Sequence, residues 1–413
     1  MIKTCHSATA FRRAASVVLP LILSLSACAT MQESQRTSRS TPAPETVRPR
    51  AAESTLSFAV AGDIMVHRAQ LESAYDKKCK CYDFKTVFAP ARPLFRGVDV
   101  VIANLETTLP GKNFTGYPAF GSPDSLVDAI KDSGINILTT ANNHAVDKGK
   151  HGLVRTIEVL QRKGIRHLGT YSNLDDYRKH RVFILEQNGF RVALLNYTYG
   201  SNEIPTPKGT QLNRIDKNLI AEDIALARQK KAEVVIVLYH FGTEYLHKPD
   251  AFQRQMVKHA FVQGADIVIG GHPHHVQPYT VFSHEDDDGR MRPRLVVYSL
   301  GNFVSAQRRR YTDGGMVLYF TIRKRQEADG RVALDITDVH HRLVWVYAKK
   351  LKTREQFYIL PIETYLAKQS DIELSDWARA QMRRYRTDSE LVLRRKEGAM
   401  IAATPVRQTA TVE

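Results

Sequence analysis

The sequence predicts an α/β fold in which a central sheet, or two stacked sheets, is flanked by helices on the outside. One observation is a series of six short apolar segments, each with the length of a buried strand and each ending in a polar tip. The other is the helical spacing of apolar residues between several of these segments, which is typical of layered α/β architectures. The six strand segments are residues 58–61, 98–103, 137–138, 234–238, 267–269 and 295–298.

The other elements follow from periodicity and turn chemistry. Asn188-Gly189 separates two apolar segments, which predicts a β-hairpin over residues 181–186 and 191–197. Later strands are expected at residues 316–323 and 332–346. Helices are expected at residues 125–133, 152–163, 221–230 and 252–263.

The polar tips of the six strands point to a metal site. Functional sites of layered α/β folds gather at the C-terminal ends of strands, and Asp, Glu, Asn and His suit Zn, Mn, Fe or Mg. The most informative tip follows residues 267–269: two glycines allow a close backbone approach, and His272 and His274 are spaced to reach one ion. A surface loop that happens to contain histidines is the alternative there. Six such tips predict that the polar side chains converge in one crevice.

Six short motifs occur in a fixed order between Leu56 and Thr321. They are AGDIM at Ala61–Met65, NLETTL at Asn104–Leu109, ANNHAVDKG at Ala141–Gly149, HFGTEY at His240–Tyr245, GGHPHHVQP at Gly270–Pro278 and YSLGNFV at Tyr298–Val304. As a set they resemble the CapA-type capsule-synthesis proteins, which are associated with poly-gamma-glutamate and whose fold is similar to that of the calcineurin-like metallophosphatases. The resemblance implies a metallophosphatase-like β-sandwich core flanked by helices, with a C-terminal helical appendage.

The resemblance also implies a centre for one or two divalent metal ions, with Mn, Zn, Fe and Mg as candidates. Glu106 stands where the related phosphatases place a bridging carboxylate, and Asn143 would add an amide oxygen. His144 stands where they place a histidine that touches the substrate, and it is expected to be catalytic through proton transfer. The implied metal ligands are Asp63, Glu106, Asn143, His240, His272 and His274.

Other polar residues of the motifs are open to two interpretations. Glu244 would line the wall of the site or have a packing role, and Asn302 would contact the substrate or cap a strand end. The ligand candidates have structural alternatives as well: Asp63 as a helix cap or turn residue, and His240 as a satisfied core histidine.

One position departs from the phosphatase pattern. Those enzymes begin with Asp-x-His, whereas the third position here is Met65. Either the second metal is bound more weakly, or His67 reaches into the site, or the site holds one ion. His67 and His275 are otherwise expected to be bystanders.

The chain is expected to divide into four parts. They are residues 1–27, a lipoprotein signal peptide; 28–54, a disordered tether; 55–347, the CapA-like domain; and 348–413, a basic and partly helical tail. Leu25-Ser26-Ala27-Cys28 resembles the bacterial lipoprotein cleavage box, so Cys28 would become the lipidated N-terminus. Ordinary cleavage with an incidental Cys28 is the alternative. The expected location is the cell envelope, lipid-anchored at the periplasmic face of the outer membrane.

Cysteine content is consistent with an exported protein, and the net charge bears on its partners. Cys79 and Cys81 are expected to form a tight disulfide or to be two surface thiols, and a C-x-C metal site is the third interpretation. The formal net charge of +16 favours an anionic partner, or else it reflects composition and solubility alone. No nucleic-acid motif is present, so nucleic acid is not expected as a partner.

The function expected from these features is that of an envelope lipoprotein with a metal-dependent, hydrolase-like site. It would act in the synthesis, export or remodelling of an anionic, poly-gamma-glutamate-like surface polymer. Expected partners are that polymer or a phosphorylated envelope substrate, the membrane through the N-terminal lipid, and a polymer synthase or export complex. Two rivals remain: a metal-dependent phosphoesterase or peptide epimerase, and a non-catalytic polymer-binding or export scaffold.

Overall fold

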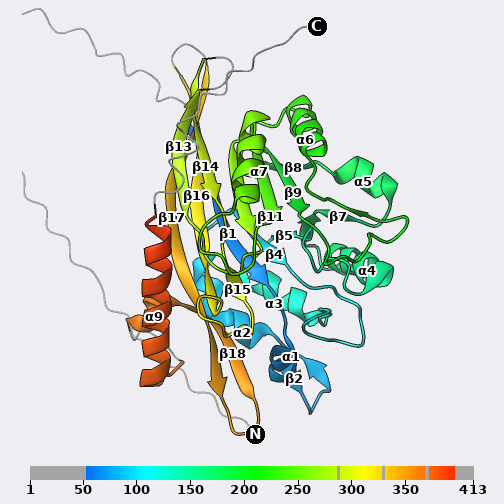
Figure 1. Cartoon of the computed structure of the whole chain (residues 1–413), viewed down its shortest axis with the longest axis vertical. Coiled ribbons are helices and arrows are strands. Elements are labelled where there is room, and N and C mark those ends of the chain that lie inside the picture. Colours follow the sequence, from blue (N-terminus) through cyan, green and yellow to red (C-terminus); the bar gives the residue numbers. More distant parts are fainter. Residues whose placement is uncertain (1–52, 286–288, 328–330, 368–371, 396–413) are drawn as a thin grey trace, which may run out of the picture. The chain divides into compact units, whose positions relative to one another are not determined.

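The computed structural model describes residues 53–285, 289–327, 331–367 and 372–395 (Figure 1). The expected signal peptide, Cys28 and nearly all of the expected tether lie outside the described residues. Among the described helices, none is both long and apolar enough to cross a membrane.

The first sheet has eight strands, with β1 near its middle. Their order is β18-β17-β16-β1-β4-β5-β6, and β15 also pairs with β1. β1, β4, β5 and β6 are parallel neighbours, and β16 joins β1 in antiparallel register. The bounds are β1 Glu53–Ile64, β4 Val100–Leu105, β5 Ile137–Thr139, β6 Arg166–Leu168, β15 Asn302–Val304, β16 Gly314–Gln326, β17 Val332–Lys350 and β18 Glu355–Pro361.

The second sheet has six strands, in the order β13-β14-β12-β11-β9-β8. β9, β11, β12 and β14 are parallel, so their C-terminal ends lie at one edge of the sheet. The bounds are β8 Phe183–Gln187, β9 Phe190–Thr198, β11 Val234–His240, β12 Ile267–Gly271, β13 Tyr279–Glu285 and β14 Met291–Val297. Two short pairs complete the strands: β2 (Tyr75–Asp76) with β3 (Cys81–Tyr82), and β7 (Thr170–Tyr171) with β10 (Gln211–Leu212).

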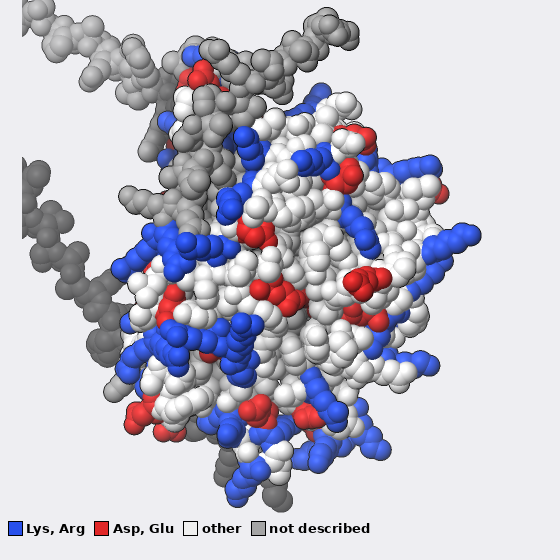
Figure 2. Space-filling view, in the orientation of Figure 1, with Lys and Arg blue, Asp and Glu red and all other residues white. Residues whose placement is uncertain are grey.

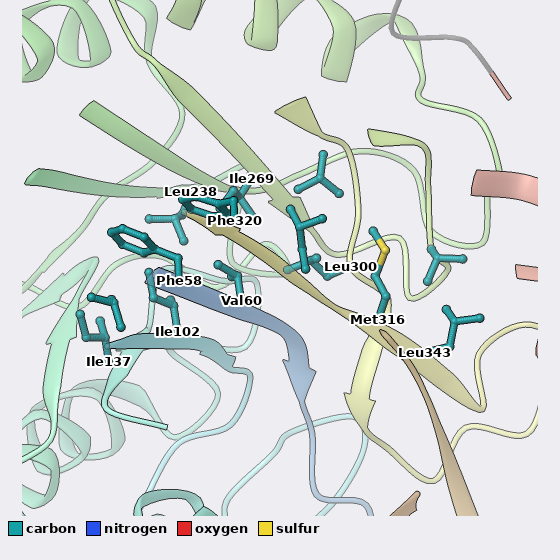
Figure 3. Close-up of a cluster of buried hydrophobic side chains, with 14 of the residues drawn as sticks. Phe58, Val60, Ile102, Ile137, Leu238, Ile269, Leu300, Met316, Phe320 and Leu343 are labelled. Carbon is teal, nitrogen blue, oxygen red and sulfur yellow. The ribbon is translucent and has the colours of Figure 1, made fainter. Parts of the chain in front are cut away.

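A hydrophobic core lies between the two sheets (Figure 3). Alternate residues of a strand face opposite sides, so Phe58 and Val60 of β1 belong to this core while Ala59 and Ala61 face the outer layer. Phe58 stacks on Phe320 of β16, with ring centroids 4.8 Å apart. The two-sheet arrangement is therefore a packed sandwich, as the sequence predicts.

Helices cover the outer faces of both sheets. α2 and α3 belong to the outer layer that covers β4 and β18, and α6 and α7 cover β11 and β12 (Figure 1). α9 packs on β17 through Ala378, Met382 and Tyr385, which join the core. The bounds are α1 Arg68–Ala74, α2 Lys85–Phe88, η1 Ala89–Leu94, α3 Ser125–Ser133, α4 Gly149–Arg162, α5 Leu174–His180, α6 Lys217–Gln229, α7 Ala251–Val262, α8 Ile362–Leu366 and α9 Asp376–Leu393.

The expected elements are present with small shifts of their ends. The helix at 125–133 has the predicted bounds, and the hairpin around Asn188-Gly189 is formed by β8 and β9. The CapA-like domain is expected to end at residue 347, but β17 continues past this residue and pairs with β18. The first sheet therefore includes residues on both sides of the expected boundary. Cys79 and Cys81 form a disulfide.

Candidate metal centre

Polar side chains from both sheets meet where the parallel strands end. β1 and β4 supply Asp63 and, just beyond β4, Glu106, while β11 supplies His240. The loop after β12 supplies His272 and His274, and the turn after β5 supplies Asn143. All six side chains are buried, and Asp63 and Glu106 have an exposed fraction of 0%. The structure therefore brings these six side chains together at the strand ends.

Asp63 is the first carboxylate of the cluster. Its Oδ1 accepts a hydrogen bond from Asn104 Nδ2 at 2.9 Å, and its Oδ2 lies 3.4 Å from His274 Nδ1. Burial raises the pKa of Asp63, but the hydrogen bond from His274 and the charge of His240 outweigh it, so the pKa lies below its usual value. Asp63 is therefore held as an anion inside the protein.

Glu106, His240 and Asn143 form the neighbouring part of the cluster. His240 Nε2 lies 2.7 Å from Asn143 Oδ1 and 3.6 Å from Glu106 Oε1, while its Nδ1 is 3.9 Å from Asp63 Oδ1. Glu106 Oε1 is fully buried and has no hydrogen-bond partner in the described structure. A buried carboxylate oxygen without a donor is costly unless a cation satisfies it.

His272 and His274 adopt left-handed backbone conformations, with φ of 97° and 57°. Burial lowers the pKa of His272 well below its usual value, and its buried Nδ1 has no hydrogen-bond partner among the described residues. A neutral imidazole with an unused nitrogen is the form that binds metals. Burial also lowers the pKa of His274, but the hydrogen bond with Asp63 and the charge of Glu106 outweigh it and raise the pKa to about 9. The carboxylates thus make this pocket favourable for positive charge.

Two groups of ligand atoms are close enough to hold an ion. One consists of Glu106, His272 and His274, and the other of Asp63, Glu106 and His240; within each group the atoms lie within 4.8 Å of one another. Glu106 is common to both groups. The donors and their unpartnered atoms are compatible with a divalent metal centre.

His144 lies beside this cluster. Its Nδ1 is 2.7 Å from Asp147 Oδ2, and its ring packs edge-on against Phe120 with centroids 4.6 Å apart. Burial lowers the pKa of His144, but the hydrogen bond with Asp147 and the charge of Glu106 outweigh it, so the pKa lies above its usual value. The Asp147 contact fixes the proton on Nδ1 and leaves Nε2 for another partner.

Glu244 and Asn302, the two residues expected in the site wall, differ in their burial and in their contacts. Glu244 has a side-chain exposed fraction of 41%, and its Oε1 lies 4.0 Å from His274 Nε2. Asn302 is fully buried; its Oδ1 accepts from His274 Nδ1 at 3.0 Å, and its Nδ2 donates to Gln307 and to the Thr312 carbonyl. Asn302 thus orients a candidate ligand.

The residues expected to be bystanders lie outside both ligand groups. His67 precedes α1, its Nδ1 accepts the Ala306 backbone N–H at 3.2 Å, and burial lowers its pKa to about 4. His275 stacks on His247 with ring centroids 4.5 Å apart. Met65, at the position of the absent histidine, is a buried core residue with an exposed fraction of 1%.

Sequence reasoning missed the polar partners of the cluster. Asn104 hydrogen-bonds to Asp63 and contacts Glu106, and Asp147 holds His144. Asn104 belongs to the NLETTL motif and Asp147 to the ANNHAVDKG motif. Their polar side chains within these motifs were the sequence feature that could have indicated a role in the site.

The comparisons with known proteins agree with the motifs. The family model described as bacterial capsule synthesis protein PGA_cap matches residues 57–307, and the chain belongs to this family. It is 28% identical over 339 residues to the capsule biosynthesis protein CapA of Bacillus anthracis, covering 79% of this chain and 76% of the relative. It is 28% identical over 294 residues to the PGA biosynthesis protein CapA of Bacillus subtilis (strain 168), covering 70% of this chain and 73% of the relative.

Among solved structures, the NAD nucleotidase NadN of Haemophilus influenzae is similar with a TM-score of 0.45 and 14% identity. The alignment covers 82% of this chain and 68% of that one. The calcineurin-like phosphoesterase YfkN of Bacillus subtilis has a TM-score of 0.39 and 14% identity, covering 83% of this chain and 99% of that one.

Proposed function

We propose that this protein acts in the cell envelope on an anionic surface polymer of the polyglutamate type, through a metal-dependent, hydrolase-like site. The observation that carries the proposal is Glu106, which belongs to both ligand groups and has a buried oxygen without a hydrogen-bond partner among the described residues. The names of the Bacillus relatives, which refer to capsule and PGA biosynthesis, support the choice of polymer.

In this proposal Asp63, Glu106, Asn143, His240, His272 and His274 would hold one or two divalent ions. When bound, the metal would polarise a substrate oxygen or lower the pKa of a water molecule. His144 would then exchange a proton with the reacting group through Nε2, because Asp147 occupies Nδ1. Burial of the cluster keeps bulk water away from these charges, and the lower dielectric strengthens the electrostatic interactions between them.

We also propose that Cys28 carries a lipid that anchors the protein in the envelope, on the support of the Leu25-Ser26-Ala27-Cys28 sequence. Metabolic labelling with a radioactive fatty acid tests whether Cys28 carries a lipid. Label in the parent and none in a Cys28→Ser variant is expected, and label in both would contradict the anchor.

Metal content tests the centre itself. The full chain should hold about one or two equivalents of divalent metal, and a His272→Ala variant should hold far less. His180→Ala on α5 is the matched control, because His180 is exposed and pairs only with Asp176 in the described structure. Absence of metal in the parent after reconstitution with Mn or Zn would refute the centre.

Activity then separates the reaction classes. We expect the metal-loaded parent to cleave γ-linked glutamate polymer and the His272→Ala variant to be inactive. Activity on phosphate esters alone would favour a phosphoesterase. Polymer binding without cleavage, with full metal content, would favour a scaffold whose metal is structural.

A further inference from the structure

Three consecutive arginines lie on the loop that follows Asn302, without a role in the chemistry proposed above. Arg308, Arg309 and Arg310 belong to the segment 305–313, here called the arginine loop, which connects β15 to β16. They follow directly after residue 307, where the match to the capsule family model ends.

Side-chain contacts on both sides hold the arginine loop in place. Gln307 accepts a hydrogen bond from Asn302 at 3.0 Å, and Asn302 in turn contacts the candidate ligand His274. Arg310 donates two hydrogen bonds to Asp388 of α9, at 2.9 and 2.7 Å. The loop is therefore tied both to the candidate centre and to the C-terminal helix.

Arg309 lies on an aromatic ring that is itself fixed to the histidine loop. Its guanidinium carbon is 4.5 Å from the centroid of the Tyr245 ring. The Tyr245 backbone N–H donates to the Pro273 carbonyl at 2.9 Å, and Pro273 lies between His272 and His274. The Tyr245 ring is 6.0 Å from the His274 ring, so one aromatic ring separates Arg309 from the candidate ligands.

Arg309 differs from its neighbour Arg310 in its ion pairing within the part of the chain that the structure describes. Arg310 has Asp388 as its partner, whereas no carboxylate of the described residues forms an ion pair with Arg309, which is exposed. A guanidinium stacked on a ring keeps its N–H edges available for a bidentate contact with a carboxylate. On the face drawn in Figure 2, Lys and Arg side chains gather on the side where α9 lies in Figure 1.

We propose that Arg309, positioned by Tyr245, forms a subsite for a carboxylate of the polymer unit next to the one at the metal centre. This inference rests on the proposed function and adds the residue that recognises the charge of the substrate. A polymer with one carboxylate per unit can place one unit at the metal and another against Arg309. The loop would thus select an anionic chain over a neutral one.

Calorimetric titration of the full chain with a short γ-linked glutamate oligomer tests the subsite. Arg309→Gln should weaken binding about tenfold, the loss expected for the charge-assisted contact of an exposed guanidinium with a carboxylate. The affinity of Arg309→Lys for the oligomer should lie between those of the parent and Arg309→Gln, because lysine keeps the positive charge but lacks the planar guanidinium that binds a carboxylate through two N–H groups. Arg178→Gln, an equal change of charge at an exposed residue of α5, should bind like the parent. The difference between parent and Arg309→Gln should shrink at high salt.

The outcomes separate this inference from the proposed function. Binding of the oligomer by Arg309→Gln as tightly as by the parent would overturn the subsite and leave the polymer assignment intact. No binding by the parent would overturn both. Metal content measured on the same samples should be equal in parent and Arg309→Gln; a loss in the variant would show an effect on the centre and contradict a separate subsite.

Discussion

Asn302 Oδ1 accepts a hydrogen bond from His274 Nδ1 at 3.0 Å, and Asn302 lies opposite Asp63 in the parallel pairing of β15 with β1. An amide oxygen can only accept a hydrogen bond, so Nδ1 of His274 carries a proton in this contact, which orients the ring. Partners of this kind commonly tune metal affinity by about ten- to a hundredfold.

Asn302→Ala is therefore expected to weaken metal binding by about ten- to a hundredfold, measured by competition with a chromogenic chelator. Gln307→Ala is the matched control, because it removes a partner of Asn302 Nδ2 but leaves the acceptor for His274. Equal metal affinity in parent and Asn302→Ala would contradict the orienting role.

Asp147→Asn should lower the pKa of His144. The Asp147 carboxylate raises that pKa through its hydrogen bond and its charge, against the opposite effect of burial. Titration of the imidazole resonances by NMR in metal-free parent and variant measures the change. If the pKa of His144 is the same in both proteins, Asp147 does not control its protonation.

The convergence of the ligands could be predicted because it depends on strand ends. Apolar segments followed by polar tips place Asp63 and His240 at the C-terminal edges of parallel strands, whatever the details of packing. The order of the motifs then indicated which tips belong together.

The partners of the ligands could not be predicted in the same way. Asn302 reaches His274 from a strand 28 residues further along the chain, and that register depends on how β15 pairs with β1. His67 had two interpretations at the level of sequence; the backbone N–H of Ala306, 239 residues away, occupies its Nδ1. Contacts between residues so far apart in the chain depend on tertiary structure, and they produce no periodic pattern in the sequence.

Gly270→Ala should destabilise the protein and impair metal binding together. A Cβ at residue 270 would lie 2.1 Å from the Tyr298 carbonyl oxygen, which belongs to backbone and cannot move away cheaply. Overpacking of this kind costs about 1–3 kcal/mol or more. Gly200→Ala is the control, since a Cβ there meets nothing within 4 Å. Thermal melts and metal analysis check both; a Gly270→Ala protein with the melting temperature and metal content of the parent would contradict the close approach.

Asp223 predicts a pH dependence of stability that is independent of the metal centre. It accepts a hydrogen bond from Tyr197 at 2.8 Å and lies 2.9 Å from Arg181, and burial raises its pKa to about 6. The unfolded carboxyl loses its proton near pH 3.8. Between these values the folded state holds more protons, so this contribution to the free energy of unfolding falls as the pH rises from about 4 to about 6.

Asp223→Asn removes the titrating group while keeping an acceptor for Tyr197. The melting temperature of the variant minus that of the parent should therefore increase as the pH rises from about 4 to about 6, and level off above this range. Differential scanning calorimetry at several pH values measures this difference. A difference that stays constant with pH would mean that Asp223 already ionises in the folded protein at its ordinary pKa, because Arg181 and Tyr197 then offset the cost of burial.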